Sequence, residues 1–347
     1  MTDTITTATP RPPSGAAPLV EVEGFSLDLA RGREFAPVLS DVSLSIDRGE
    51  VVGLVGESGS GKSTLALSMM GLVPRRISRV RGGSITIGGV DIVGRSDREL
   101  QDVRGERIGM VFQEPMTALD PAYRVGDQIA EMIRRHRGIS HAAARREAIE
   151  NLQLAEVADA ARRADAFPHE LSGGLRQRVC IAMAIACRPE FLIADEPTTA
   201  LDVTTQAQIL DLLRRLRSEM GMTVVLISHD LAVIAEFCDR VVVLYGGQVL
   251  ETAPVDDFFV APRHPYSSAL LQALPEHQPP LTELTTLPGS PPALGDELPG
   301  CRFAPRCGFA QAGRCDVSPI PLTLAADGRQ DRCIRSGELH LPGVKDD

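Results

Sequence analysis

The sequence has no run of apolar residues long enough to cross a bilayer, which takes about 18 to 20 consecutive positions. Its continuous apolar stretches, such as 241–245, have the length of a single strand. The first 18 residues are rich in Thr, Pro and Ala, and they lack the charged start and the apolar segment of a secretory signal. We therefore expect a disordered N-terminal tail at residues 1–18, and any work at a membrane to be done through partner proteins.

An excess of positive charge is also missing. Across 347 residues, 36 Lys and Arg stand against 46 Asp and Glu, which gives a formal net charge of −10. A broad footprint on a phosphate backbone needs clustered positive charge, so we expect no nucleic-acid partner. The length allows one large α/β core with a small appended unit.

The apolar pattern predicts an α/β fold. A helical insertion is expected at about 120–163 and a helix at 205–219, whereas the prolines after residue 260 break up regular elements and mark a domain boundary or an extended arm. Strands are predicted at 38–46, 51–55, 191–194 and 224–227, with an edge strand at 19–29, a hairpin around 84–87 and a strand pair at 240–250.

The segment Gly56–Ser63 satisfies the phosphate-loop pattern G-x-x-x-x-G-K-[ST] between a buried strand and a helix at 64–70. Its glycines let backbone N–H groups converge on phosphate oxygens, and the helix N-terminus adds positive partial charge. Lys62 can reach the β- and γ-phosphates, and the Ser63 hydroxyl is a hard ligand for Mg²⁺. The strand–loop–helix context makes a chance flexible loop the weaker interpretation. The predicted nucleotide contacts are Gly56, Glu57, Ser58, Gly59, Ser60, Gly61, Lys62, Ser63 and Thr64.

Two acids end the apolar strand 191–194, where only the carboxyl tip of a buried strand is free to carry charge. Asp195 is placed to hold Mg²⁺, and Glu196 can polarise an attacking water. His229 follows the strand 224–227, which a parallel arrangement would bring to the same sheet edge, so we predict a γ-phosphate contact. Gln113, after the short strand 110–112, can bind Mg²⁺ or water.

A second glycine-rich helix start lies at Leu171–Arg178, with Ser172 as the cap and Gly173 and Gly174 after it. Such an N-terminus suits an anion. Spacing alone leaves open a simple capped helix.

Together these segments resemble the nucleotide-binding domain of an ABC transporter over about 19–260, with a P-loop core, an antiparallel β subdomain and a helical subdomain at about 114–175. The matching motifs are the Walker A loop Gly56–Ser63, the Q-loop Gln113, the signature Leu171–Gln177, the Walker B strand Phe191–Glu196, the D-loop Ala200-Leu201-Asp202 and the switch histidine His229.

The resemblance implies hydrolysis of ATP with Mg²⁺, Glu196 acting as general base. It implies a head-to-tail pair of ATPases, in which each ATP lies between one phosphate loop and the signature segment of the other subunit. The residues that it adds to the ATP site are Ser172, Gly173, Gly174, Gln177 and Asp202. The family usually stacks an aromatic residue on adenine; here that place holds Leu29, with Phe35 as a candidate substitute.

The surroundings of Gln113, together with His264-Pro265-Tyr266 and Leu287–Pro292, resemble oligopeptide and dipeptide importers, whose ATPases carry a C-terminal extension, here residues 261–347. The implied partners are two permease subunits, a second ATPase (a paralogue or an identical copy) and an extracytoplasmic solute-binding protein. The implied place is the cytoplasmic face of a bacterial membrane, with a permease coupling helix docked on Gln113–Gln128. We expect His264-Pro265-Tyr266 itself to be a helix-entry turn without chemistry.

Other functions stay open. The same role in a nickel or other small-solute importer fits the extension equally well. An ABC ATPase acting on ribosomes or DNA would be expected to have tandem cassettes or coiled-coil insertions, which this sequence lacks. An inactive regulatory subunit is opposed by the presence of Glu196 and His229.

Four cysteines with the spacing C-x5-C-x7-C-x17-C lie in a Pro-, Gly- and Arg-rich segment that can bury little core: Cys301, Cys307, Cys315 and Cys333. In a reducing compartment a metal is a better staple than a disulfide. Importers of the resembled family with these cysteines carry a [4Fe–4S] cluster, which the resemblance implies here, and Zn²⁺ is the alternative.

Overall fold

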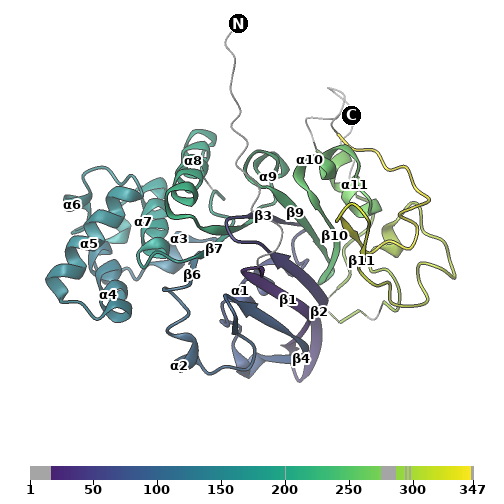
Figure 1. Ribbon diagram of the computed structural model, residues 1–347, viewed down its shortest axis with the longest axis horizontal. Helices are drawn as coiled ribbons and strands as arrows, with labels where there is room; N and C mark the ends of the chain where they lie inside the picture. The colour runs from purple at the N-terminus through teal and green to yellow at the C-terminus, as the bar shows by residue number, and fades with distance from the viewer. Residues whose placement is uncertain (1–16, 200, 275–286, 294, 297, 345–347) are drawn as a thin grey trace, which may run out of the picture.

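The computed structural model describes residues 17–199, 201–274, 287–293, 295–296 and 298–344. Within them, two sheets meet at the centre of the molecule, with a helical region to the left of the larger sheet and a C-terminal arm to its right (Figure 1). Of the tail predicted at 1–18, residues 1–16 lie outside the described residues.

The smaller sheet is antiparallel, in the order β2-β1-β4-β5. Its strands are β1 (Val20–Arg31), β2 (Glu34–Ile46), β4 (Ser78–Ile87) and β5 (Val90–Asp91). Because β1 pairs with β2 on one side and β4 on the other, the prediction of an edge strand at 19–29 is wrong. Its alternating side chains reflect a sheet with one face on the core, which an interior antiparallel strand shares with an edge strand.

The larger sheet has the order β11-β12-β10-β9-β3-β8-β7-β6. Strands β9, β3, β8, β7 and β6 run parallel, and β10, β12 and β11 continue the sheet antiparallel. Every residue of β3, β7 and β8 is buried, as their continuous apolar runs predict. The bounds are β3 (Val51–Val55), β6 (Ile108–Val111), β7 (Phe191–Asp195), β8 (Thr223–Ile227), β9 (Arg240–Tyr245), β10 (Gln248–Pro254), β11 (Thr323–Leu324) and β12 (Gln330–Asp331).

The two faces of the larger sheet pack in two separate cores. Val52 and Leu54 of β3 belong to the core shared with the smaller sheet and α1 (Lys62–Met69). Val51 and Val55 belong to the core on the other face. The helices that contribute to that second core include α7 (Gly173–Ile185), α8 (Val203–Met220) and α9 (Leu231–Phe237). Because β3 packs alternate residues into the two cores, its position in the sheet is well determined. The loop and helix α1 that follow β3 are therefore placed at the carboxyl edge of the sheet.

The helical region follows β6. It contains α3 (Pro115–Ala118), α4 (Val125–Arg137), α5 (His141–Leu154), α6 (Ala160–Arg163) and the 3₁₀ turn η2 (Pro168–Glu170). In α4 the buried Val125, Ile129 and Ile133 recur every four residues and form one apolar face. Gly138, with a φ of +62°, ends this helix in the left-handed conformation.

Short helices and turns complete the described chain: η1 (Arg75–Ile77), α2 (Asp97–Leu100), α10 (Val255–Val260), α11 (Pro265–Gln272) and η4 (Ala304–Arg306). The helix α11 begins at the helix-entry turn predicted at His264-Pro265-Tyr266, ahead of the prolines from residue 275 on. Pro265 occupies the first turn, where its missing N–H costs no hydrogen bond, and His264 caps the helix by accepting from Tyr266 N.

The arm is joined to the larger sheet rather than separate from it, because β12 pairs with β10. Arg332, whose side chain is 4% exposed, donates to the carbonyl oxygens of Val249 (3.0 Å), Ile320 (2.9 Å) and Asp41 (2.9 Å). It therefore ties the arm to both sheets. No helix of the described ranges has both the length and the apolar character that a membrane span requires.

We expect Arg332→Met to lower the free energy of unfolding by roughly 2–4 kcal/mol, since it leaves buried carbonyl oxygens without their donor. Chemical denaturation of the purified chain measures this loss. Arg314→Met is the matched control, because Arg314 pairs with Glu338 at the surface (side chains 45% and 44% exposed) and should leave the unfolding midpoint unchanged. Equal unfolding midpoints for the two variants would contradict the role of Arg332 in joining the arm to the two sheets.

Candidate nucleotide-binding site

The loop between β3 and α1 holds the residues predicted to cradle phosphates. Gly56 has a φ of +147°, and a Cβ there would lie 2.1 Å from the carbonyl oxygen of Leu244. Gly61 has a φ of +105°, and its Cβ would lie 2.8 Å from Leu39 Cδ2. Both backbone conformation and space exclude a side chain at these two positions, so glycine is what lets the loop close against β9 and β2.

The side chain of Lys62 is 8% exposed and turns back into the loop. Its Nζ donates to the carbonyl oxygens of Gly56 (2.7 Å) and Glu57 (2.9 Å) and to Ser60 Oγ (3.4 Å). Burial lowers the pKa of Lys62, and nearby carboxylates, Glu196 foremost, act in the opposite direction. The Lys62 ammonium is therefore held by acceptor oxygens of the loop. Phosphate oxygens of a bound nucleotide can take the place of these acceptors.

Two of the three predicted Mg²⁺ ligands, Ser63 and Asp195, are in contact. Ser63 lies in the first turn of α1, and Asp195 is the last residue of β7. Ser63 Oγ donates to Asp195 Oδ1 over 3.3 Å. Burial raises the pKa of Asp195, and the hydrogen bond from Ser63 opposes that shift. A hydroxyl and a buried carboxylate oxygen at this distance form a donor set that suits a hard cation.

Glu196 lies at the next position in an unusual backbone conformation, with a φ of +47°. Its N–H donates to Ile227 O over 3.0 Å, which locks this turn onto β8. Its Oε2 accepts from Gln113 Nε2 (2.8 Å) and Thr199 Oγ1 (2.9 Å) and lies 3.6 Å from His229 Nδ1. The parallel pairing of β6, β7 and β8 thus brings together side chains from three separate segments, and strained backbone of this kind is common at active sites.

One open cavity of about 680 Å³ is bordered by many of these groups, although Asp195 and Thr199 only contact lining residues. Leu29 lines it, as predicted, whereas Phe35 does not: Phe35 is 42% exposed and Arg79 lies over its ring. From the predicted site, the lining residues are Gly56, Ser58, Gly59, Ser60, Gly61, Lys62, Ser63, Thr64, Gln113, Glu196 and His229. From the arm, they are Pro291, Pro292, Ala293, Gly295, Asp296, Leu298 and Arg302. A cavity of this size that combines a glycine-rich anion cradle with apolar lining residues fits a nucleoside triphosphate.

The signature segment lies outside this cavity. Ser172 caps α7 by accepting from Leu175 N (3.4 Å), and a Cβ on Gly174 would lie 2.9 Å from Thr205 Cγ2. Asp202 caps α8 by accepting from Thr205 N (3.0 Å) and Thr205 Oγ1 (2.7 Å); Ala200 of the D-loop lies outside the described residues. Within one chain, then, the glycine-rich start of α1 borders the cavity and the glycine-rich start of α7 does not.

Gln177 departs from the predicted nucleotide contact. It is 2% exposed, with its Nε2 buried and without a hydrogen-bond partner among the described residues. Gln177 lies in the second turn of α7, and its side chain points into the protein rather than toward the surface that Ser172, Gly173 and Gly174 share. Its place in the motif therefore reflects packing of the helix in this structure.

Two polar contacts to the site were missed from sequence. Thr199 holds Glu196, and Tyr266 Oη accepts from the N–H of Glu57 in the phosphate loop over 2.9 Å. Tyr266 belongs to the His-Pro-Tyr segment from which no chemistry was expected, 209 positions from Glu57. The spacing of Thr199, three residues after Glu196, could have suggested its contact, but only the fold brings Tyr266 to the loop.

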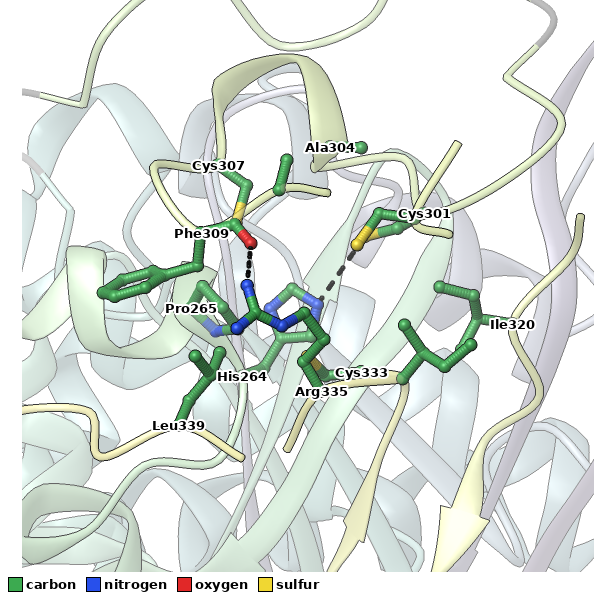
Figure 2. A pocket seen from close by; sticks show the side chains of 13 residues that line it. His264, Pro265, Cys301, Ala304, Cys307, Phe309, Ile320, Cys333, Arg335 and Leu339 are labelled. Atoms are coloured by element: carbon green, nitrogen blue, oxygen red, sulfur yellow. Dashed lines mark hydrogen bonds between the residues drawn. The ribbon is translucent and has the colours of Figure 1, made fainter. Parts of the chain in front are cut away.

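The four C-terminal cysteines all line a second cavity, of about 20 Å³, with His264 and Arg335 beside them (Figure 2). All four thiols are free, and His264 Nε2 lies 3.8 Å from Cys301 Sγ. Burial raises the pKa of Cys301 to about 11 and that of Cys333 to about 12. In the described part of the chain, no group of three or more His, Cys, Asp and Glu side chains is arranged to hold a metal ion. The donor set nevertheless fits a metal group, because four thiols from separate positions in the sequence line one cavity and form no disulfide.

Two family models match the chain. Residues 39–199 match the model described as ABC transporter. Residues 250–315 match the model described as oligopeptide/dipeptide transporter, C-terminal region. The first match covers the phosphate loop, Gln113 and Glu196, whereas His229 and the arm residues that line the larger cavity lie outside it. The second match ends at Cys315.

Individual relatives and solved structures that are similar to the chain point to the same family. A peptide import ATP-binding protein of Brucella abortus is 50% identical over 91% of this chain and 95% of its own length. A second one from that species is 47% identical over 93% of this chain and 98% of its own. The ATP-binding cassette MJ0796, solved as a dimer in a post-hydrolysis state with ADP and Pi, is 34% identical, with a TM-score of 0.61 over 68% of this chain and 98% of that one. The cbiO1 protein of Clostridium perfringens, part of the ABC transporter complex cbiONQ, is 26% identical, with a TM-score of 0.60 over 70% and 91%.

We expect Thr199→Val to reduce kcat for ATP hydrolysis about tenfold while changing KM little, since it removes one donor to the Glu196 carboxylate but no group that lines the cavity. Steady-state kinetics of the chain in its assembled complex measure both constants. Thr198→Val is the matched control, because no hydrogen bond of the Thr198 hydroxyl occurs among the described residues, and it should retain the parent kcat. A full kcat in Thr199→Val would show that this contact does not position Glu196.

Proposed function

The chain belongs to the ABC transporter family, and on this premise we propose that it is the ATP-hydrolysing subunit of an importer that carries oligopeptides or dipeptides across the cytoplasmic membrane of a bacterium. The single observation that carries the ATPase half is the meeting of Lys62, Ser63, Glu196 and His229 around one cavity, with Asp195 in contact with Ser63. The peptide half rests on the match of residues 250–315 and on relatives named for peptide import.

Each residue at the cavity has a distinct role in this proposal. Glu196 orients the attacking water and accepts its proton, while Gln113 and Thr199 hold the carboxylate that does so. Lys62 and His229 hold the γ-phosphate, and the Lys62 ammonium stabilises its charge. Mg²⁺, when bound with ATP, supplies further neutralisation of the β- and γ-phosphates, and Ser63, Gln113 and Asp195 would hold it. This last list contains only hard oxygen donors, as Mg²⁺ prefers.

The signature segment is proposed to act on the nucleotide of a second ATPase subunit. Support comes from its position outside the cavity of its own chain and from the exposed capped start of α7, which suits an anion. Val203, beside the D-loop and 84% exposed, offers an apolar contact for a facing subunit. In this arrangement Ser172, Gly173, Gly174 and Asp202 of each subunit face the phosphate loop of the other, and the paired subunit is a paralogue or a second copy.

A permease coupling helix is proposed to dock on Gln113–Gln128. Three large apolar side chains are exposed in or beside this segment: Phe112 (36%), Met116 (52%) and Tyr123 (60%). Because Gln113 also donates to Glu196, a helix pressing on this surface could alter the position of the catalytic carboxylate. Two permeases and an extracytoplasmic binding protein complete the proposed complex, with this subunit on the cytoplasmic face of the membrane. Transport of nickel or another small solute is the second candidate, which uptake assays separate from peptide transport.

The four cysteines are proposed to hold a [4Fe–4S] cluster that staples the arm. The support is the donor set itself: thiolate ligands suit iron–sulfur clusters, and four of them share one cavity. Zn²⁺ bound by the same four thiols is the alternative. The group would supply cross-linking of a segment with little core of its own, and no step of ATP hydrolysis is assigned to it.

We expect Glu196→Gln to abolish ATP turnover, with a loss of about a thousandfold or more in kcat, and to retain ATP binding, since the amide keeps the shape of the carboxylate but cannot accept the proton. Turnover and nucleotide affinity are measured on the same preparation. Hydrolysis at the parent rate would refute the role assigned to Glu196, and loss of ATP binding as well would show a wider defect.

Anaerobic purification should yield about four iron and four sulfide per chain, and visible absorbance that disappears on removal of the iron. Removal should also lower the thermal midpoint, since the arm loses its staple. About one zinc per chain without iron would identify the alternative. A chain without either metal, equally stable before and after chelation, would contradict both proposals.

A further inference from the structure

Glu57 is the one acidic residue of the loop Gly56–Ser63, and its side chain turns away from the cavity. Gly56 and Ser58, on either side of it, line the cavity, but Glu57 does not. Its Oε2 and Oε1 instead accept from Arg306 Nη1 (2.7 Å) and Nη2 (3.1 Å), a two-bond ion pair between residues 249 positions apart. The phosphate loop is therefore held from outside by the C-terminal arm.

Arg306 is built into its surroundings. Its side chain is 6% exposed, against 24% for Glu57. Its Nε donates to Pro288 O (2.7 Å) and its Nη1 to Tyr245 Oη (3.2 Å). Its guanidinium carbon lies 5.7 Å from the ring centre of Tyr245 and 6.0 Å from that of Phe303. With all three guanidinium nitrogens occupied and two rings beside it, this cation has little freedom to leave Glu57.

The backbone of Glu57 is fixed from the same side. Its N–H donates to Tyr266 Oη, and its carbonyl oxygen accepts from Lys62 Nζ over 2.9 Å. Tyr266 is fully buried and is anchored in turn by its N–H, which donates to His264 Nδ1 over 3.0 Å. Backbone and side chain of this one loop residue are thus both held by C-terminal residues that the phosphate-loop pattern does not include.

An acid in this place has an electrostatic consequence. The charge of Glu57 acts on Lys62, the ammonium that serves the phosphates. An unpaired carboxylate there would compete with phosphate for Lys62 and repel the triphosphate, because like charges in a partly buried site are screened little. Arg306 compensates that charge and draws the carboxylate out of the cavity.

We propose that Arg306 is a positioning residue for ATP binding: by holding the Glu57 carboxylate, the C-terminal arm sets the conformation of the phosphate loop and its affinity for nucleotide. The proposal rests on the proposed function only in taking ATP as the ligand of the loop. Arg306 itself touches no nucleotide, since it does not line the cavity. The arm, in this view, contributes to catalysis by the cassette through affinity and leaves the hydrolytic step unaltered.

A double-mutant cycle tests this, with Arg306→Gln, Glu57→Gln and the double variant in the full chain and its assembled complex. Arg306→Gln should raise the Kd for ATP, and KM with it, roughly tenfold, while kcat at saturating ATP stays within twofold of the parent. In the Glu57→Gln background the same substitution should change KM less than twofold, because no carboxylate is then left unpaired. Arg306→Lys, which keeps the charge but not the two-bond geometry, should lie in between.

Arg314→Gln, in the same arm, is the matched control and should change neither constant. An unchanged KM in Arg306→Gln would overturn the proposal, as would an equal loss in both backgrounds, which would mean that Arg306 acts through the fold alone. If Arg306→Gln does not fold, Arg306→Lys and the double variant decide by the same comparison. Failure of the parent chain to bind ATP would instead refute the proposed function, so the two failures are distinguishable.

Discussion

Complete burial of the central strands is the constraint on which the site depends. Each residue of β3, β7 and β8 is buried. The side chains that act on a ligand are therefore found at the carboxyl ends of these strands and in the loops that come directly after them. Parallel pairing then places the phosphate loop, Asp195 and Glu196, and His229 at one edge of one sheet. The two cores on either side of β3 hold that edge in place, because the strand contributes alternate residues to each.

The C-terminal arm is part of this construction. It extends the larger sheet through β12, ties itself to the smaller sheet through Arg332, and reaches the phosphate loop through Arg306 and Tyr266. It also forms part of the wall of the nucleotide cavity. The cysteine cavity lies in the same arm, with Cys307 directly after Arg306 in the chain, so a staple there would also steady the residue that holds Glu57.

The nucleotide cavity shows how a missing aromatic residue is accommodated. Leu29 stands where a stacking ring is usual, and Phe35 is paired with Arg79 away from the cavity. Apolar residues of the arm, among them Pro292 and Leu298, also line this cavity and offer contact surface for the nucleotide. Contact of this kind buries apolar surface without stacking geometry.

The sequence by itself determined the motifs and the central strands, because both depend on local order: a phosphate loop needs its glycines in succession, and a buried strand needs an unbroken apolar run. It predicted Asp195, Glu196 and His229 at one edge, since parallel strands share their carboxyl ends. It misplaced β1 at an edge, because one-sided burial alternates identically in interior and edge strands of an antiparallel sheet. Only the tertiary structure decided the burial of Gln177 and the contacts of Tyr266 and Arg306 with Glu57, because those depend on packing between segments more than 200 positions apart, or on the rotation of a helix that a motif does not encode.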